Sequence, residues 1–169
     1  LLASIGGGVS FLFAPLGFGN WKATVATVTG LIAKENVVGT FGVLYGFGEV
    51  GENGEEIWSS IAADYSALAA YSFMIFNLLC APCFAAMGAI KREMNNPRWT
   101  LFAIGYMCAF AYGTSLLVYQ LGGLLTGQLA FGPAAAAALV LLALLFWLLL
   151  RPAPGTGARL KRSAAPAEG

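Results

Sequence analysis

Three polar side chains stand next to each other in a long apolar stretch of the sequence. Residues 29–42 read TGLIAKENVVGTFG, so Lys34, Glu35 and Asn36 interrupt a run that could otherwise cross a bilayer. A charge near the bilayer centre costs about 2.5–3.5 kcal/mol on insertion scales, and such groups are usually functional. We therefore expect Lys34, Glu35 and Asn36 to line a wet cavity on a transport path.

A second polar cluster lies in the sequence NLLCAPCFAA at residues 77–86. Its donor side chains are three residues apart, so successive members would share a face of a helix: Asn77, Cys80 and Cys83. Pro82 has no backbone N–H, which predicts a kink that leaves the carbonyl of Leu78 free. Thiolates favour Cu(I), Zn(II) and iron over Mg(II) or Ca(II). The cluster is a candidate metal site.

Each cluster also has a structural interpretation. Lys34 and Glu35 could be a structural ion pair that holds helices together, although neighbours in sequence point to different faces of a helix. Buried cysteines are common as small hydrophobic residues, so Cys80 and Cys83 could simply pack. We assign Cys108, in GYMCAFAYG, to packing, with a place on the same path as the alternative.

The composition places these clusters in a membrane protein. Of 169 residues, 59% are hydrophobic and 10% are charged, and the mean hydropathy is +0.76, whereas soluble domains carry about 25% charged residues. The apolar runs are continuous rather than alternating, which indicates helices and not a β-barrel. The net charge of +1 predicts no nucleic-acid surface. There is no histidine and no nucleophile–base constellation, so we expect no catalytic residues and no enzyme.

The fold class expected is all-α: a polytopic helical membrane protein fragment with about four transmembrane helices. A truncated or re-entrant apolar segment precedes them at residues 1–18, where Gly6-Gly7-Gly8 and Pro15 interrupt the hydrophobic run. The remaining segments are a transport core at 19–121 with spans at about 21–45, 68–90 and 99–121, an acidic loop at 47–66, a last transmembrane helix within 122–150, and a basic disordered tail at 151–169.

Lysine and arginine in short flanking segments predict the orientation of these spans. The basic turn at 91–98 and the tail from Arg151 should be cytoplasmic, and strict alternation of four spans then places Lys22 inside as well. The acidic loop should lie outside, where its carboxylates would attract cations or simply form a solvated loop: Glu49, Glu52, Glu55, Glu56 and Asp64.

Two blocks of the sequence resemble the C-terminal membrane region of the prokaryotic ferrous iron transporter family, FeoB. They are APLGFGNWKATVATVTGLIAKENVVGTFGVLYG and NLLCAPCFAAMGAIKREMNNPRWTLFAIGYMCAFAYG, and the resemblance covers about residues 14–121. It implies an Fe(II) permease of the bacterial or archaeal cytoplasmic membrane, multi-pass, with a cytoplasmic C-terminus. The glutamate of the family's AKE stretch corresponds to Glu35, and its membrane cysteine pair corresponds to Cys80 and Cys83. With Fe(II) as the implied substrate, we expect its ligands to be Glu35, Asn36, Asn77, Cys80 and Cys83. Lys34 would then be a gating residue or a charge partner. Residues 122–169 follow the family loosely.

The resemblance also implies partners. Family members carry an N-terminal GTP-binding domain, and no GxxxxGK motif occurs here, so we expect a fragment that meets GTP and Mg only through a missing N-terminal part. Fe(II) would be a substrate and not a permanently bound cofactor. The expected partners are the lipid bilayer, further copies of the chain and small accessory proteins of iron uptake. Two alternatives stay open: a gate-type carrier for nucleosides or other small solutes, and a membrane assembly module that transports nothing.

Overall fold

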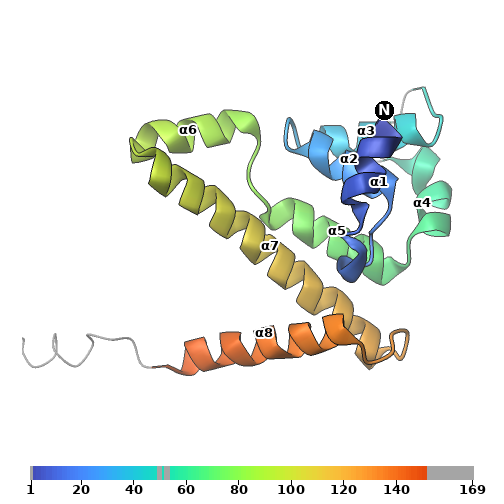
Figure 1. The fold of residues 1–169 in the computed structure, drawn as a ribbon. Helices are drawn as coiled ribbons and strands as arrows, with labels where there is room; N and C mark the ends of the chain where they lie inside the picture. Colours follow the sequence, from blue (N-terminus) through green and yellow to red (C-terminus); the bar gives the residue numbers. More distant parts are fainter. Residues whose placement is uncertain (1, 49–50, 52–53, 152–169) are drawn as a thin grey trace, which may run out of the picture.

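The computed structural model describes residues 2–48, 51 and 54–151, and all the regular secondary structure in these residues is helical (Figure 1). In chain order the elements are α1 (Leu2–Ser10), η1 (Ala14–Leu16), α2 (Trp21–Gly30), α3 (Asn36–Leu44), η2 (Glu55–Ile57), α4 (Trp58–Asp64), α5 (Ala67–Leu79), α6 (Phe84–Met94), α7 (Pro97–Leu125) and α8 (Pro133–Leu150). The all-α prediction is confirmed.

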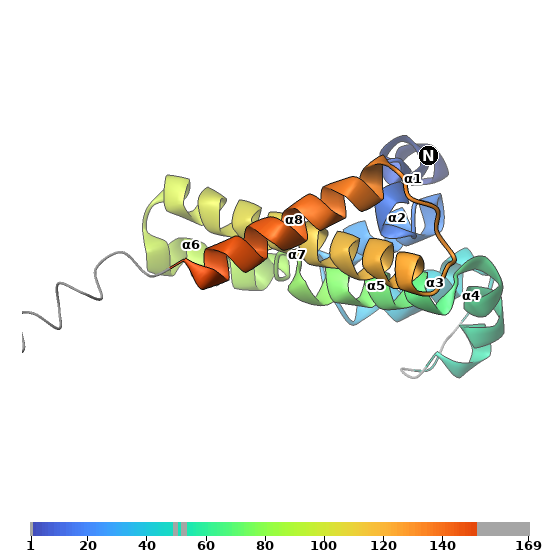
Figure 2. The same ribbon diagram turned by 90° about the horizontal axis from the view of Figure 1, so that it is seen from below.

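Three stretches of the described residues are long and apolar enough to cross a membrane. They are Ala67–Met94, which comprises α5 and α6, then Pro97–Leu125 and Pro133–Leu150, close to the spans expected at 68–90, 99–121 and within 122–150. Figure 2 shows α8 lying across α7. Only 11% of the α8 window is buried, and the exposed leucines of this helix form a surface that a bilayer would cover.

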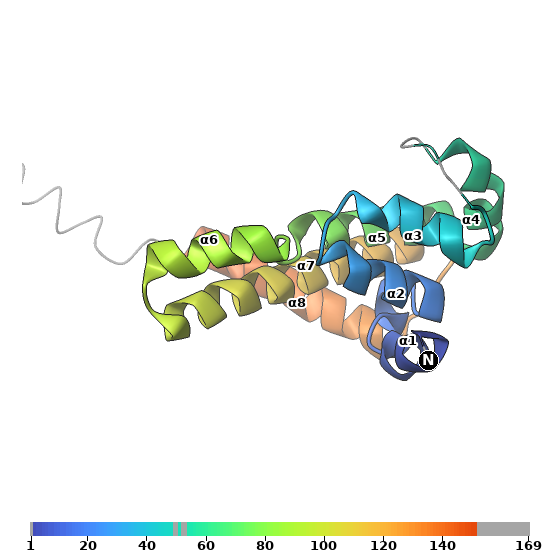
Figure 3. The ribbon, with the colours of Figure 1, turned by 90° about the horizontal axis from the view of Figure 1, so that it is seen from above.

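The span expected over residues 21–45 is not one helix. The chain turns at 31–35 and returns as α3, which packs against α2 as an antiparallel hairpin (Figure 3). Thr29 Oγ1 lies 3.0 Å from Thr40 Oγ1 across this hairpin. Both helices are too short to span a bilayer, which takes about 20 residues. The hairpin therefore begins and finishes at the same end of the bundle, and the single helix expected over 21–45 is corrected to two short helices.

The same hairpin corrects the predicted side of Lys22. Lys22 Nζ lies 2.8 Å from Asp64 Oδ2, at the end of α4, although strict alternation of spans placed these two residues on opposite sides of the membrane. The error follows from counting 21–45 as a crossing. The described part of the acidic loop and the start of the hairpin share one end of the bundle, called here the acidic end. The turn between α6 and α7, with Lys91 and Arg98, lies at the opposite, basic end (Figure 1).

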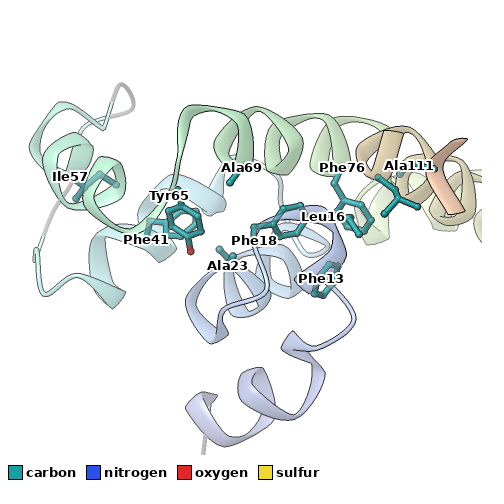
Figure 4. Packing of buried hydrophobic residues seen from close by; sticks show 13 residues of the cluster. Phe13, Leu16, Phe18, Ala23, Phe41, Ile57, Tyr65, Ala69, Phe76 and Ala111 are labelled. Atoms are coloured by element: carbon teal, nitrogen blue, oxygen red, sulfur yellow. The ribbon is translucent and has the colours of Figure 1, made fainter. Parts of the chain in front are cut away.

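The segment between α1 and α2 forms much of the core. Phe13 and Phe18 are buried and stack at 5.4 Å between ring centroids (Figure 4). Phe18 also meets Phe73 of α5 edge to face at 5.2 Å. This segment contains only the single short turn of η1, so several of its carbonyls need partners from other elements. An unsatisfied backbone group inside a membrane protein costs several kcal/mol. Side chains of α5 and α7 satisfy them: Tyr112 donates to Leu12 O, Gln120 to Pro15 O and Ser72 to Leu16 O.

Candidate functional site

The predicted kink at Pro82 is a complete break in the helix. Helix α5 ends at Leu79 and α6 begins at Phe84, with Cys80 to Cys83 in extended or irregular backbone. The break has the predicted cause, because proline can neither donate a backbone hydrogen bond nor follow a helical residue comfortably. It also corrects one inference: the residues from Asn77 to Cys83 do not share a single helical face.

Lys34 binds the carbonyl groups that this break exposes. Its Nζ donates to the main-chain oxygens of Asn77 at 2.7 Å, Leu78 at 3.2 Å and Cys80 at 3.4 Å. The carbonyl of Leu78, predicted to be free, is thus one of three that converge on the ammonium group. The last carbonyls of a helix carry a partial negative charge and favour a cation. Lys34 therefore caps α5 from another helix pair.

The tip of the α2–α3 hairpin and the α5–α6 break stabilise each other in both directions. The first amide of α6, at Phe84, donates to the carbonyl of Leu31 in the hairpin tip at 3.2 Å. Gly30 lets the elements approach, because a Cβ there would lie 2.7 Å from Val37 Cγ2 and 3.6 Å from Asn77 Oδ1. An interrupted membrane helix, here α5–α6, is the element that builds ion and substrate sites in many secondary transporters.

The two predicted oxygen ligands of the polar triplet lie at the hairpin tip. Glu35 and Asn36 are both exposed, at the start of α3. Within the described residues, no group of three or more histidine, cysteine, aspartate or glutamate side chains is close enough to hold a metal ion. The structure thus does not gather Glu35, Cys80 and Cys83 into one cluster. Their roles as ligands, and those of Asn36 and Asn77, stay predictions.

The thiol nearest to Cys80 comes from another helix. Cys80 Sγ lies 3.7 Å from Cys108 Sγ in α7, and the three cysteines are free and half-buried. Among the described residues no hydrogen bond joins Cys83 to either of the other thiols. Sequence reasoning paired Cys80 with Cys83 and assigned Cys108 to packing. The sequence spacing could have indicated the pair, because Cys80 and Cys108 lie at similar distances along the chain on either side of the basic turn.

Asp64 is the centre of a polar network at the acidic end. It accepts hydrogen bonds from Lys22 at 2.8 Å and from Tyr45 at 2.6 Å, and Lys22 Nζ lies 3.9 Å from the centroid of the Tyr45 ring. These hydrogen bonds, first that of Lys22, lower the pKa of the Asp64 carboxyl below its usual value. The network joins α2, α3 and α4, which gives Asp64 a structural role beside the predicted attraction of cations.

Of the other four predicted acidic residues, the structure describes the side chain of one. Glu55 is exposed at the start of η2. Glu49 and Glu52 lie outside the described residues, and the side chain of Glu56 is not among those described. Whether this loop raises the local cation concentration stays a prediction.

A family model described as Gate, nucleoside recognition, matches residues 1–97. Curated relatives include the Fe(2+) transporter FeoB of Methanocaldococcus jannaschii, which is 42% identical over 124 residues, and that of Staphylococcus aureus strain COL, which is 36% identical over 123 residues. Each match covers 73% of this chain and 18% of the relative, so the chain spans less than a fifth of the length of these relatives.

One relative is a fusion of two proteins in one chain. The Fe(2+) transport protein A/Fe(2+) transporter FeoB fusion protein of Porphyromonas gingivalis is 36% identical over 132 residues, which is 72% of this chain and 15% of the relative. No solved structure matches this chain.

Proposed function

This chain belongs to the family described as Gate, nucleoside recognition, and from that membership and its FeoB relatives we propose that it forms the ion-conducting membrane part of an Fe(II) transporter. The meeting of the α2–α3 hairpin tip with the α5–α6 break carries this proposal. There the hairpin tip presents Glu35 and Asn36, and the end of α5 presents Asn77, Cys80 and three carbonyls already bound to a positive charge.

The chemistry at the breaks suits a transported Fe(II) ion. Fe(II) accepts carboxylate, carboxamide and thiolate ligands, and conduction requires binding that is weak enough to release the ion. Donors dispersed over a hairpin tip and a helix end meet this requirement better than a closed cage of cysteines. In this proposal Fe(II) comes in from the acidic end, passes the breaks and leaves at the basic end, which faces the cytoplasm of a bacterial or archaeal cell.

In this proposal the whole transporter contains further parts, which the resemblance implies. These are a GTP-binding domain that gates or drives the path, further copies of the chain, and an accessory protein of the kind fused to the P. gingivalis relative. We assign the role of gate to Lys34, because in this conformation its ammonium group donates hydrogen bonds to the carbonyls at the end of α5.

The test is uptake of Fe(II) by iron-starved cells that express a full-length transporter carrying these residues. We expect Glu35→Gln and the Cys80→Ser/Cys83→Ser double variant each to lose most uptake at normal levels of membrane-inserted protein. Glu93→Gln is the control, because it removes an exposed carboxylate at the basic end. Uptake that survives in both test variants would contradict the proposed path.

A second candidate is a carrier for nucleosides, which the description of the matching family favours. It predicts uptake of labelled nucleoside into proteoliposomes, competition by unlabelled nucleoside, and no effect of replacing the cysteines by serine. Labelled uptake without competition by Fe(II), together with unchanged transport in the cysteine variants, would support this candidate over the iron path.

A further inference from the structure

Cys80 and Cys108 come from two different helices and lie with their sulfur atoms 3.7 Å apart. Cys80 directly follows α5, Cys108 lies within α7, and both thiols are half-buried and free. We infer that these two cysteines, and not Cys80 with Cys83, form the thiolate pair of a site for a tetrahedral divalent metal ion. The inference deepens the proposed function, on which it rests for the class of ion.

The separation of the two sulfur atoms suits tetrahedral coordination. A metal–sulfur bond of about 2.3 Å and a tetrahedral angle place two thiolate ligands about 3.8 Å apart. A linear two-coordinate ion such as Cu(I) would hold them about 4.6 Å apart with bonds of that length. The observed separation of 3.7 Å is close to the tetrahedral value, so the pair can accept a tetrahedral ion with little movement of α5 or α7. Such preorganisation lowers the cost of binding.

The end of α5 places main-chain oxygens that hold a positive charge beside the two thiols. The carbonyls of Asn77, Leu78 and Cys80 all accept hydrogen bonds from the Lys34 ammonium. Cys80 contributes both a thiol and one of these carbonyls, so the dithiol and the oxygen cluster are adjacent. Unwound carbonyls and helix C-terminal ends bind cations in discontinuous membrane helices. An ion held by both sulfur atoms would find oxygen donors beside it once Lys34 moves away.

Cys83 stands apart from this pair because the helix is broken before it. It stands at the N-cap position of α6 without a side-chain capping hydrogen bond, and Ala81 and Pro82 separate it from Cys80 in non-helical backbone. The Cys-x-x-Cys spacing would bring the two thiols to one side only in an intact helix. A site with two thiolates and oxygen donors also binds less tightly than one with four thiolates, as a transport path requires.

Metal binding at this pair releases protons. Both thiols must lose a proton to become ligands, so one divalent ion binds as two protons leave, with no change of oxidation state. Affinity should therefore rise with pH, and chelation should reverse the binding completely. Air oxidation to a disulfide would instead remove the site, so the pair must be kept reduced.

The test uses Co(II) with the purified, reduced, full-length protein in lipid nanodiscs under nitrogen. Tetrahedral Co(II) bound to thiolates gives a near-ultraviolet charge-transfer band and intense visible bands. We expect the wild type and Cys83→Ser to show them, and Cys80→Ser and Cys108→Ser each to lose them. Fe(II) should compete with the Co(II) only when it is in large excess, because Co(II) binds a given site more tightly than Fe(II). Bands that persist in Cys108→Ser, or that vanish in Cys83→Ser while Cys108→Ser keeps them, would overturn the inference.

A second measurement on the wild type avoids any variant that fails to fold. Co(II) should protect Cys80 and Cys108 from alkylation by a maleimide, read by peptide mass spectrometry, while Cys83 reacts at its unchanged rate. Equal protection of all three thiols, or of none, would contradict the assignment. Because neither readout involves uptake, the site and the proposed function can fail separately: bands without any effect of Cys80→Ser on Fe(II) uptake would retain the site and reject the path.

Discussion

Lys34 Nζ donates to the main-chain oxygen of Asn77 at 2.7 Å, between two residues that are 43 positions apart in the sequence. This hydrogen bond joins the turn between α2 and α3 to the end of α5. The ammonium group therefore has partners without any carboxylate, because helix-end carbonyls carry enough partial negative charge to hold it. The break in α5–α6 and the lysine in the α2–α3 turn are two halves of one structural feature.

Replacing Lys34 by methionine should lower the stability of the protein. Lys34→Met keeps the length of the side chain and removes the ammonium group, which leaves three carbonyls without their donor. A hydrogen bond that involves a charged group contributes about 1.5–3 kcal/mol, so we expect a loss of about 1–3 kcal/mol in the free energy of unfolding. Thermal unfolding in detergent, followed by tryptophan fluorescence, measures it. Lys91→Met, at an exposed lysine of α6, is the matched control, and equal shifts in both would contradict the capping role.

The network at the acidic end should make stability depend on pH. Hydrogen bonds from Lys22 and Tyr45 lower the pKa of Asp64 in the folded state, so its ionised form stabilises the fold. That contribution is fully present above the unfolded pKa of about 3.9 and is lost as the pH falls through the lower folded value. We expect wild type to be more stable than Asp64→Asn at neutral pH and the difference to close in that acidic range.

Denaturation curves from about pH 7 to about pH 2.5 test this expectation. Glu55→Gln is the control, because it removes an exposed carboxylate from the same end of the bundle. A difference between wild type and Asp64→Asn that stays constant down to the lowest pH would show that the carboxylate does not act through its ionised form.

The buried contact between Ser72 and Ser115 should couple α5 to α7. Both side chains are fully buried, their hydroxyl oxygens lie 2.7 Å apart, and Ser72 also donates to Leu16 O. Hydrogen bonds between membrane helices are worth about 0.6 kcal/mol on average and up to about 1.7 kcal/mol. A double-mutant cycle with alanine at each position should give a coupling energy in that range. Thr114→Ala should cost little, because its hydroxyl bonds within its own helix to Phe110 O; additive effects of the two serine variants would contradict the coupling.

Much of the membrane architecture could be predicted from the sequence, because it depends on properties of contiguous residues. The three spans are continuous apolar runs with polar turns between them, and such runs need no distant contact to be recognised. The interruption at Pro82 follows from proline chemistry within one helical turn. Hydropathy failed for residues 21–45, which are apolar enough for a span but turn back at 31–35.

The features that the sequence could not place depend on contacts between distant segments. At the hairpin turn, the missing side chain of Gly30 leaves room for Val37. The residues beside the α5–α6 break form hydrogen bonds with Lys34 and with the carbonyl of Leu31. No local pattern reports that meeting. The pairing of Cys80 with Cys108 depends on the rotation of α5 against α7, which sequence periodicity leaves undetermined. The sequence indicated both a carbonyl freed by Pro82 and a lysine without an evident partner. In the structure, Lys34 donates a hydrogen bond to that carbonyl, which belongs to Leu78.

The last prediction concerns the sides of the membrane. Because the α2–α3 hairpin turns back, Lys22 shares the acidic end with Asp64, whereas a crossing would put it beside the basic turn. Cysteine placed at Lys22, at exposed Ser59 of α4 or at exposed Arg92 of α6, in a background with the three native cysteines changed to serine, reports the side through an impermeant maleimide.

We expect Lys22→Cys and Ser59→Cys to react from the same side of right-side-out vesicles, and Arg92→Cys only after the membrane is opened. The positive-inside rule makes the side of Arg92 the cytoplasmic one, since lysine and arginine in short turns are retained there. Reaction of Lys22→Cys together with Arg92→Cys would restore four crossings and remove the re-entrant hairpin. The contact of Lys34 with the end of α5 would then have to form from a continuous helix, which the turn at 31–35 does not allow.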